Sequence, residues 1–316
     1  MTPPIIANCD VFASVSGGKD STAMCLHLRE QGIPYRAVFA DTGWEHRDTY
    51  AYLRELDPII GPIQWVRAEV PLEGKRLAMA EELEALLGHY SAMVRTVLKK
   101  AVMPARTLRW CTSETKVYPL DSVMTAGDRE TITANGVRAA ESAKRAHLGE
   151  WEFSEDRDLW VWRPLIRWTT QDVIDIHLRH GLKPNPLYLT VNARRVGCWP
   201  CINSRKSEIL AIATTDPTRI EVIRRLERYV AELARERIET DGREQIHTDP
   251  TWFQAPKLVT LPDGRTGYAA PIDDVVAWSK TGRGGNVKQT ELFMPRTEPG
   301  CIRWGMCDFG IDDDEE

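Results

Sequence analysis

The sequence predicts an α/β protein, with a mostly parallel, twisted sheet flanked by helices and a helical, cysteine-bearing part after it. Over residues 1–168 short apolar runs alternate with helix-forming runs, which is the pattern of a parallel sheet covered on both faces. The stretch SGGKDS, Ser16–Ser21, follows the first apolar run, and ligands of such sheets bind beyond the carboxyl ends of the strands. From residue 169 onward, longer charged helical patterns replace the alternation. We therefore expect an α/β domain at 1–168 and a second, helical or irregular part at 169–316, with the boundary between Leu165 and Thr170.

The individual elements follow from apolar periodicity and from glycine and proline positions. The expected strands are Val11–Ser14, Tyr35–Ala40, Ile63–Val66, Glu130–Ala134 and Trp160–Trp162. The expected helices are Ser21–Glu30, Asp48–Leu56, Ala78–Leu87, Thr170–His180 and Pro217–Glu239. Between the last two helices, Lys183–Tyr188 predicts an extended loop set by its prolines. Thr248–Arg265 predicts loops and short strands.

Composition narrows the functional class. The chain has 316 residues, a net charge of −5 and no apolar run close to the roughly 18 residues of a membrane span. Its first residues, MTPPIIANCD, lack the basic and long apolar regions of a signal peptide, so we expect a cytoplasmic protein without a membrane partner. Seven cysteines in a cytoplasmic chain point away from disulfides and towards metal or sulfur chemistry.

The negative net charge conceals three cationic segments, Arg106–Lys116, Arg194–Lys206 and Lys280–Lys288. A mildly acidic total argues against nonspecific coating of nucleic acid but is compatible with a local basic groove. The last two segments are therefore candidates for contacts with nucleic-acid phosphates, although the glycine-rich KTGRGGNVK stretch also fits a solvated loop.

The corner after the first strand has the chemistry of a polyphosphate site. Gly17 and Gly18 allow a sharp turn that brings backbone amides close to a ligand, and the helix that follows adds unpaired N–H groups. Lys19 contributes a full positive charge, and three hydroxyl groups lie nearby, on Ser14, Ser16 and Ser21. The spacing is neither that of a Walker loop nor GxGxxG. The alternative is a glycine-rich turn with polar residues facing solvent.

SGGKDS resembles the pyrophosphate loop of the N-type ATP pyrophosphatases, which cleave ATP between its α and β phosphates. Within that superfamily the chain resembles the phosphoadenosine phosphosulfate reductase-like family through Asp41–Leu53, Arg109–Leu120 and Gly136–Ala146. The resemblance implies an adenine nucleotide alpha hydrolase-like, Rossmann-like fold that binds ATP and Mg²⁺. It implies nucleotide contacts from Ser14, Ser16, Gly17, Gly18, Lys19, Asp20, Ser21, Asp41, Thr42, Gly136 and Arg138. It places catalytic roles on Lys19, Asp20, Cys111 and Arg138.

Several of these residues have competing interpretations. Asp41 could hold a ribose hydroxyl or the Mg²⁺ shell, or it could cap a helix. Arg138 suits a phosphate through its forked donors, or it could pair with Glu141. Lys116 and Arg109 fit exposed charges as well as they fit phosphate ligands.

Two departures separate this chain from the phosphosulfate reductases of that family. Those reductases lose the lysine of the loop, whereas Lys19 is present here. They also end in a catalytic cysteine followed by glycine and histidine, whereas this chain ends CIRWGMCDFGIDDDEE. Because a lysine among the phosphates compensates the charge of departing pyrophosphate, we expect the site to take ATP.

The cysteines suggest a metal or cluster site. Cys198 and Cys201 form a CxxC pair, and Cys301 and Cys307 form a second pair; four cysteines suit Zn²⁺ or a [4Fe–4S] cluster. A resemblance to the ATP pyrophosphatase of DNA phosphorothioation favours the cluster, while two unrelated buried pairs remain the alternative. Cys111 lies among Arg106, Arg109 and Lys116, which predicts a lowered thiol pKa and a role as nucleophile or sulfur carrier. It could also be a cluster ligand in place of Cys301 or Cys307.

These features together predict an ATP pyrophosphatase and sulfurtransferase that adenylates a substrate oxygen for sulfur insertion. We expect a cysteine desulfurase as the sulfur donor and a nucleic acid as the substrate, with DNA favoured over tRNA by the resemblance to phosphorothioation enzymes. One alternative enzyme is a phosphoadenosine or adenosine phosphosulfate reductase of sulfate assimilation. A tRNA thiolation enzyme is another, and the non-catalytic alternative is a nucleotide-binding scaffold subunit. Cys9 and Cys25 are expected in the core.

Overall fold

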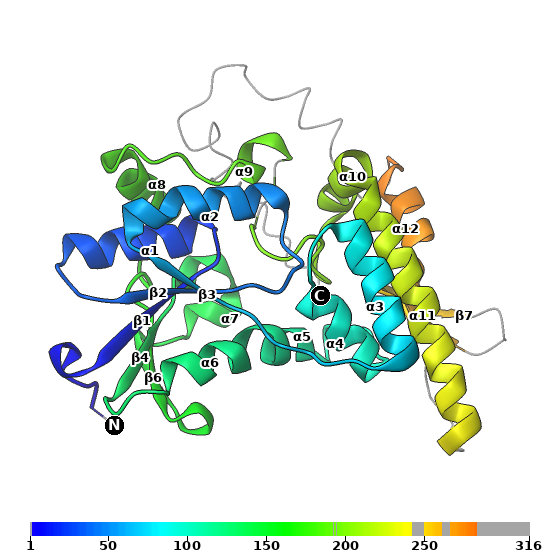
Figure 1. Cartoon of the computed structure of the whole chain (residues 1–316). Helices are drawn as coiled ribbons and strands as arrows, with labels where there is room; N and C mark the ends of the chain where they lie inside the picture. The colour runs from blue at the N-terminus through cyan, green and yellow to red at the C-terminus, as the bar shows by residue number, and fades with distance from the viewer. Residues whose placement is uncertain (1, 192, 194, 242–249, 261–265, 283–316) are drawn as a thin grey trace.

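A six-stranded sheet forms one side of the molecule in the computed structural model, which describes residues 2–191, 193, 195–241, 250–260 and 266–282 (Figure 1). The strand order is β3-β2-β1-β4-β6-β5. The strands are β1 (Asp10–Val15), β2 (Arg36–Ala40), β3 (Ile63–Val66), β4 (Thr131–Ala134), β5 (Trp151–Ser154) and β6 (Leu159–Trp162). All neighbours pair in parallel except β5, which pairs antiparallel with β6. The expected mostly parallel α/β sheet is confirmed.

Both faces of the sheet are covered, because alternate residues of each strand point to opposite sides. Val11, Ala13 and Val15 pack in the core with helices α1 (Lys19–Glu30), α2 (Arg47–Ile60) and α8 (Thr170–Arg179). Phe12 and Val38 instead contact Met124 of α6 (Tyr118–Met124) on the opposite face. The sheet is therefore the middle layer of a three-layer sandwich.

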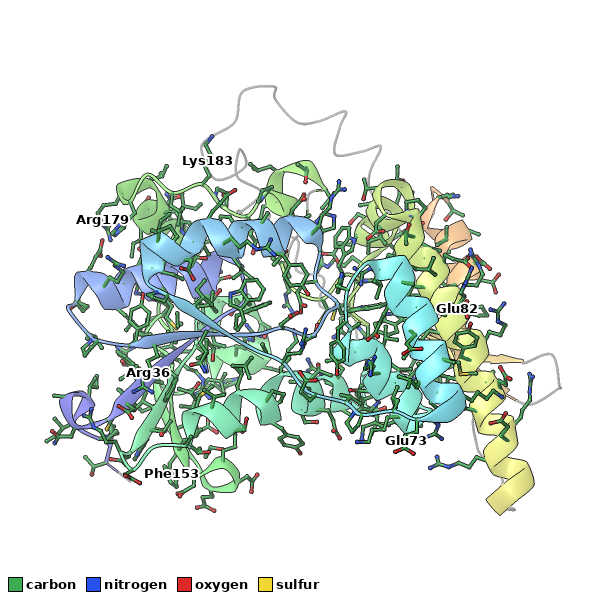
Figure 2. The ribbon with its side chains drawn as sticks, viewed as in Figure 1. Arg36, Glu73, Glu82, Phe153, Arg179 and Lys183 are labelled. Atoms are coloured by element: carbon green, nitrogen blue, oxygen red, sulfur yellow. The ribbon has the colours of Figure 1, made fainter. Side chains whose placement is uncertain are left out.

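A second core lies beside the sheet and is built from helices on both sides of residue 168. In Figure 1 these helices stand together on the right. They are α3 (Gly74–Leu87), α4 (Ala92–Lys100), α10 (Lys206–Thr215), α11 (Pro217–Asp241) and α12 (Ile272–Ser279). An antiparallel hairpin of β7 (Phe253–Thr260) and β8 (Thr266–Ala270) completes this half. Figure 2 shows Glu82 of α3 at the contact with α11, where it binds Arg225 and Tyr229.

Short helical segments connect the two halves. α5 (Trp110–Thr112), a π-helical turn (Ser113–Val117) and α6 form one continuous run. The remaining short helices are α7 (Ala143–Ala146) and α9 (Leu187–Thr190). Single 3₁₀ turns occur at Ile6–Asn8, Ala139–Glu141 and Glu155–Arg157. π-Helical turns inside helices occur frequently at functional sites, and this one carries Lys116.

The five expected strands and five expected helices are present, with ends shifted by up to four residues. The expected extended loop at Lys183–Tyr188 is wrong at its end, because α9 begins at Leu187. Strand β5 and helix α4 were not expected from the apolar pattern. Within the described residues, no helix combines the length and apolar character needed to cross a membrane. The division at residue 168 stays a prediction.

Candidate functional site

A cavity of about 290 Å³ opens where the strand order reverses direction around β1 and β4. Such a switch point is where ligands bind in open parallel sheets, because the loops after adjacent strands diverge there. The loop after β1 forms one wall and the loop after β4 forms the other. Eight of the sequence-predicted nucleotide contacts line it: Ser14, Ser16, Gly18, Lys19, Asp20, Ser21, Gly136 and Arg138.

The loop after β1 is held in shape by its own hydrogen bonds. The Ser21 hydroxyl accepts from the backbone N–H of Ser16 at 3.1 Å and donates to the carbonyl of Gly18 at 3.0 Å. Gly17 has a φ of +72°, which a residue with a Cβ adopts only at a cost, and a Cβ there would lie 2.9 Å from Thr49. The paired glycines are thus explained by backbone geometry, although Gly17 itself does not line the cavity.

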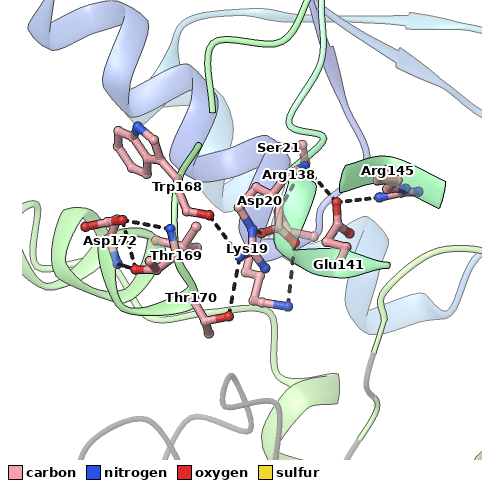
Figure 3. Close-up of polar contacts among 12 residues, drawn as sticks. Lys19, Asp20, Ser21, Arg138, Glu141, Arg145, Trp168, Thr169, Thr170 and Asp172 are labelled. Carbon is pink, nitrogen blue, oxygen red and sulfur yellow. Dashed lines mark hydrogen bonds and ion pairs between the residues drawn. The ribbon is translucent and has the colours of Figure 1, made fainter. Parts of the chain in front are cut away.

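Lys19, Asp20 and Arg138 form a buried charge chain (Figure 3). The Arg138 Nε donates to Asp20 Oδ1 at 2.7 Å, and Lys19 Nζ lies 3.5 Å from Asp20 Oδ2. Arg138 is 1% exposed and Lys19 is 7% exposed. The alternative pairing of Arg138 with Glu141 is wrong for the guanidinium. Glu141 instead accepts from the Arg138 backbone N–H and pairs with Arg145.

The β4 loop packs directly on the start of α1. A Cβ on Gly136 would lie 2.6 Å from the carbonyl oxygen of Asp20 and 2.8 Å from the nitrogen of Ser21. The absence of a side chain therefore lets the two walls of the cavity touch. Beside it, Asn135 lines the cavity, and its buried Oδ1 has no hydrogen-bond partner among the described residues. That oxygen is available to accept from a ligand.

Residues from the second half of the sequence complete the cavity. The buried Tyr188 hydroxyl accepts from the Lys19 backbone N–H at 3.2 Å, and the Lys19 ammonium lies 5.4 Å from the centre of the Tyr188 ring. Asn185, fully buried, donates to the Gly17 carbonyl at 3.1 Å. Arg195 and Val196 also line the cavity. Sequence reasoning missed these contacts, because no local pattern links residues so far apart in the chain.

Asp41 and Thr42 end β2 but do not line the cavity. Asp41 accepts from the Gly43 backbone N–H and from the Tyr50 hydroxyl, and Thr42 donates to Glu45 at 2.8 Å. Asp41 is not a helix cap, since the cap of α2 is His46. The role of Asp41 and Thr42 as nucleoside contacts stays a prediction.

The CxxC pair lies against the loop after β2. Cys198 bridges Glu45 as an isolated β-bridge, and the Trp199 N–H donates to the Trp44 carbonyl at 2.7 Å. The Lys116 side chain hydrogen-bonds Cys198 and lies 3.9 Å from Glu45. Burial, the largest cause, raises the pKa of Cys198 to about 11, while Lys116 opposes that rise.

Cys111 lies close enough to the CxxC pair to interact electrostatically with Cys201. The charge of a Cys201 thiolate contributes to its pKa, and Cys111 and Cys198 pack against the same core. The expectation of a lowered pKa at Cys111 is wrong. Burial raises the pKa of Cys111 and outweighs the opposing effect of Lys116 and Arg109. Cys9 and Cys25 lie in the core as expected.

The proposed four-cysteine set is only partly covered by the structure, because Cys301 and Cys307 lie outside the described residues. Within the described part of the chain, no group of three or more His, Cys, Asp or Glu side chains is arranged to hold one metal ion. Cys111, Cys198 and Cys201 are free thiols, which is the donor type that iron–sulfur clusters require. Their role as cluster ligands stays a prediction.

The sequence matches one protein family and resembles several known proteins. Residues 10–204 match the family described as phosphoadenosine phosphosulfate reductase domain. An uncharacterized 37.8 kDa protein in the gpa 5′ region of Escherichia phage 186 is 38% identical over 255 residues, covering 71% of this chain and 76% of that protein. An adenosine 5′-phosphosulfate reductase of Streptomyces coelicolor is 28% identical over 193 residues, covering 61% of this chain and 71% of that protein. A solved phosphoadenylyl-sulfate reductase from Candida auris, in a phosphate complex, aligns with a TM-score of 0.44 and 16% identity, covering 60% of this chain and 81% of that one.

Proposed function

Because the chain belongs to the phosphoadenosine phosphosulfate reductase domain family, a nucleotide-binding family, we propose that it is an ATP pyrophosphatase that adenylates a substrate oxygen for sulfur insertion. The observation that carries the proposal is Lys19, whose ammonium is held at the cavity between Asp20 and the Tyr188 ring. A buried cation beside the first amides of α1 suits a polyphosphate. A site without such a lysine could bind a phosphosulfate but would lack the charge that stabilises departing pyrophosphate.

In the proposed reaction a substrate oxygen attacks the α-phosphorus of ATP, and the α–β bond breaks with release of pyrophosphate. The Lys19 ammonium and the backbone amides of Gly18, Asp20 and Ser21 would neutralise the negative charge that builds on the leaving group. Arg138 would orient the α-phosphate, with Asp20 fixing its guanidinium. The cavity carboxylates of Asp20 and Glu141 are oxygen donors of the kind that hold the Mg²⁺ of a nucleotide, through water or directly.

The second half-reaction would use the cysteine region. The terminal sulfur of a cysteine persulfide, formed with a cysteine desulfurase, would attack the adenylated centre, and AMP would leave with the original oxygen. A second thiol would then attack the S–S bond, which releases the thiolated product and leaves a disulfide between the carrier cysteine and that thiol. A [4Fe–4S] cluster would be held by Cys111, Cys198 and Cys201, with either Cys301 or Cys307 as the fourth ligand. When bound, the cluster would supply iron that holds the sulfur before its transfer. We propose that the substrate is a nucleic acid and favour DNA over tRNA.

Pyrophosphate release from ATP tests the first half-reaction. We expect purified protein to release pyrophosphate with Mg²⁺ and substrate, and Lys19→Ala to lower that rate by about 100-fold or more, as loss of a key charge-stabilising group does. Lys99→Ala, which removes an exposed lysine of α4, is the matched control and should leave the rate unchanged. Equal rates for Lys19→Ala and the unmodified protein would remove Lys19 from the reaction.

A phosphosulfate reductase is the second candidate, favoured by the family match and by the Streptomyces coelicolor relative. A reductase would release sulfite from adenosine phosphosulfate in the presence of a thiol donor, without consuming ATP. Sulfite release with no pyrophosphate release would select this candidate. Pyrophosphate release with no sulfite would select the ATP pyrophosphatase. A chain that binds ATP and does neither would be the non-catalytic subunit.

A further inference from the structure

Described residues of the three cationic segments lie close together in the fold, whereas residues 283–288 of the third segment lie outside the described part of the chain. Lys206 donates from Nζ to the Thr281 carbonyl at 2.7 Å, which joins the second segment to the residue after Lys280. Arg106, from the first segment, donates from Nε to Asn203 Oδ1 at 3.1 Å. These two contacts bring together segments that are far apart in the sequence, and we call their four cations, Arg106, Arg205, Lys206 and Lys280, the cationic rim.

One member of this rim, Arg106, lines a second cavity of about 500 Å³, distinct from the one at the β1 loop, and Lys206 lies over the ring of Trp278, which lines the same cavity. Arg106 and the Ile202–Ser204 turn form one side, while the β7–β8 hairpin and α12 form the other. The aromatic side chains of the lining are Trp252, Phe253 and Trp278. Two of its polar groups, Gln254 and Asp274, could bond the edge of a planar ligand. A cavity of this size and composition is typical of sites for a ring-containing ligand.

Trp278 gives the cavity an accessible stacking surface. It is 46% exposed, and the Lys206 ammonium lies 5.0 Å from the centre of its ring. An exposed aromatic ring beside cations is the combination by which proteins bind unpaired nucleotides, because bases stack on the ring and phosphates meet the charges. An acidic peptide or a lipid phosphate would also meet these charges, but a nucleotide adds a planar base that stacks on the Trp278 ring.

We propose that this second cavity binds single-stranded nucleic acid, with one base stacked on Trp278 and the flanking phosphates on the cationic rim. The inference deepens the function proposed above and rests on it for the nature of the acceptor. Ile202 directly follows Cys201, so a nucleotide in this cavity lies beside the cysteine region. On the other side of the same loop, Arg195 and Val196 line the first cavity. The CxxC pair thus lies, in the sequence, between residues that line the proposed ATP site and residues that line the proposed nucleic-acid site.

Fluorescence anisotropy with a labelled 12-nucleotide single-stranded DNA and the full chain tests the proposal. We expect Trp278→Ala to weaken binding by about 5- to 100-fold, as loss of a stacked base does, and Trp278→Phe to restore most of the affinity. Arg106→Gln and Lys280→Gln should each reduce the dependence of affinity on salt concentration. Trp65→Ala and Arg36→Gln change an exposed tryptophan and an exposed arginine of the sheet, far from this cavity, and should leave binding unchanged.

Pyrophosphate release is measured on the same variants, so that the two proposals can fail separately. DNA binding that is equal in Trp278→Ala and the unmodified chain would overturn the second site while leaving the ATP chemistry intact. The same holds for an oligonucleotide that does not bind a chain able to release pyrophosphate. A preference for a peptide over the oligonucleotide at this cavity would also overturn it. Weakened DNA binding by Trp278→Ala with normal nucleotide turnover would support it.

Discussion

Asp20 forms ion pairs with both Lys19 and Arg138 in the first cavity. One carboxylate oxygen binds Arg138 and the other faces Lys19, so two buried cations share one anion. A phosphate entering the cavity would add the negative charge that this arrangement lacks. The loop is therefore prepared for an anion before the ligand arrives, which lowers the cost of reorganisation on binding.

Gly136→Ala tests whether close contact between the two cavity walls is required. The added Cβ would approach the backbone of Asp20 and Ser21 at 2.6 to 2.8 Å, and backbone atoms cannot move aside as a flexible side chain can. We expect a loss of about 1–3 kcal/mol in the free energy of unfolding and weaker nucleotide binding. Urea denaturation and calorimetry measure both. Gly149→Ala, whose Cβ would approach only to 3.4 Å, should change neither.

At the scale of residues, the sequence predicts the polyphosphate loop but not the distant residues that hydrogen-bond to it. Gly17, Gly18 and Lys19 could be recognised because their chemistry is local to one strand, one turn and one helix. Tyr188 and Asn185 could not, because their contacts with Lys19 and Gly17 depend on a chain path of about 170 residues. The pKa of Cys111 was misjudged for a similar reason, since neighbouring charges are visible in a sequence and burial is not.

At the scale of elements, the segment before α9 holds the β1 loop from the outside. Asn185 donates to the Gly17 carbonyl, and its own Oδ1 accepts from the Leu187 N–H at 3.0 Å. Asn185→Ala would leave both backbone groups unpaired in a buried place, so we expect a loss of about 1–3 kcal/mol in stability and weaker ATP binding. Asn8→Ala, on an exposed turn, should have no effect. Unchanged stability and affinity in Asn185→Ala would contradict this role.

Helix α11 is connected to the hairpin and to α12 by one carboxylate. Glu227 accepts from the Trp252 N–H at 2.9 Å and from the Ile272 N–H at 3.1 Å. Burial raises the pKa of Glu227 to about 7 and outweighs the opposing effect of these two bonds. Because the folded-state pKa exceeds the ordinary value of about 4.5, the contribution of Glu227 is fully present below that pH and is lost as the pH rises to about 7.

The Glu227→Gln variant removes this titration. We expect the stability of the unmodified protein, relative to the variant, to fall by about 1–3 kcal/mol between pH 4.5 and 8, and to level off above that range. Urea denaturation of both proteins across this range gives the difference directly. A difference that does not vary with pH would show that Glu227 titrates at its ordinary value.

For the molecule as a whole, the sheet could be predicted, whereas the packing of the helices in the second half could not. Alternating apolar runs specify β strands and helices locally, and the parallel order follows from their connections. The pairing of α3 and α4 with α10 and α11 is different, because it joins helices from both sides of residue 168 through apolar faces that carry no information about their partners. The convergence of three cationic segments on one cavity was hidden for the same reason.

The segment that carries Cys198 and Cys201 contributes to both cavities, since residues before the pair line the first and residues after it line the second. In the proposed reaction ATP would bind in the first cavity, the acceptor nucleic acid would bind in the second, and the cysteines of this segment would carry out the sulfur transfer. The account depends first on the triphosphate being bound by the loop after β1.

A crystal structure of the full chain with Mg²⁺ and an ATP analogue carrying a methylene between the α and β phosphorus atoms tests that dependence most directly. We expect the phosphate oxygens within about 2.7–3.2 Å of the Gly18, Asp20 and Ser21 amides and of Lys19 Nζ, with Arg138 turned towards the α-phosphate. Phosphates bound elsewhere in the molecule, with the β1 loop free of ligand at saturating analogue, would contradict the account.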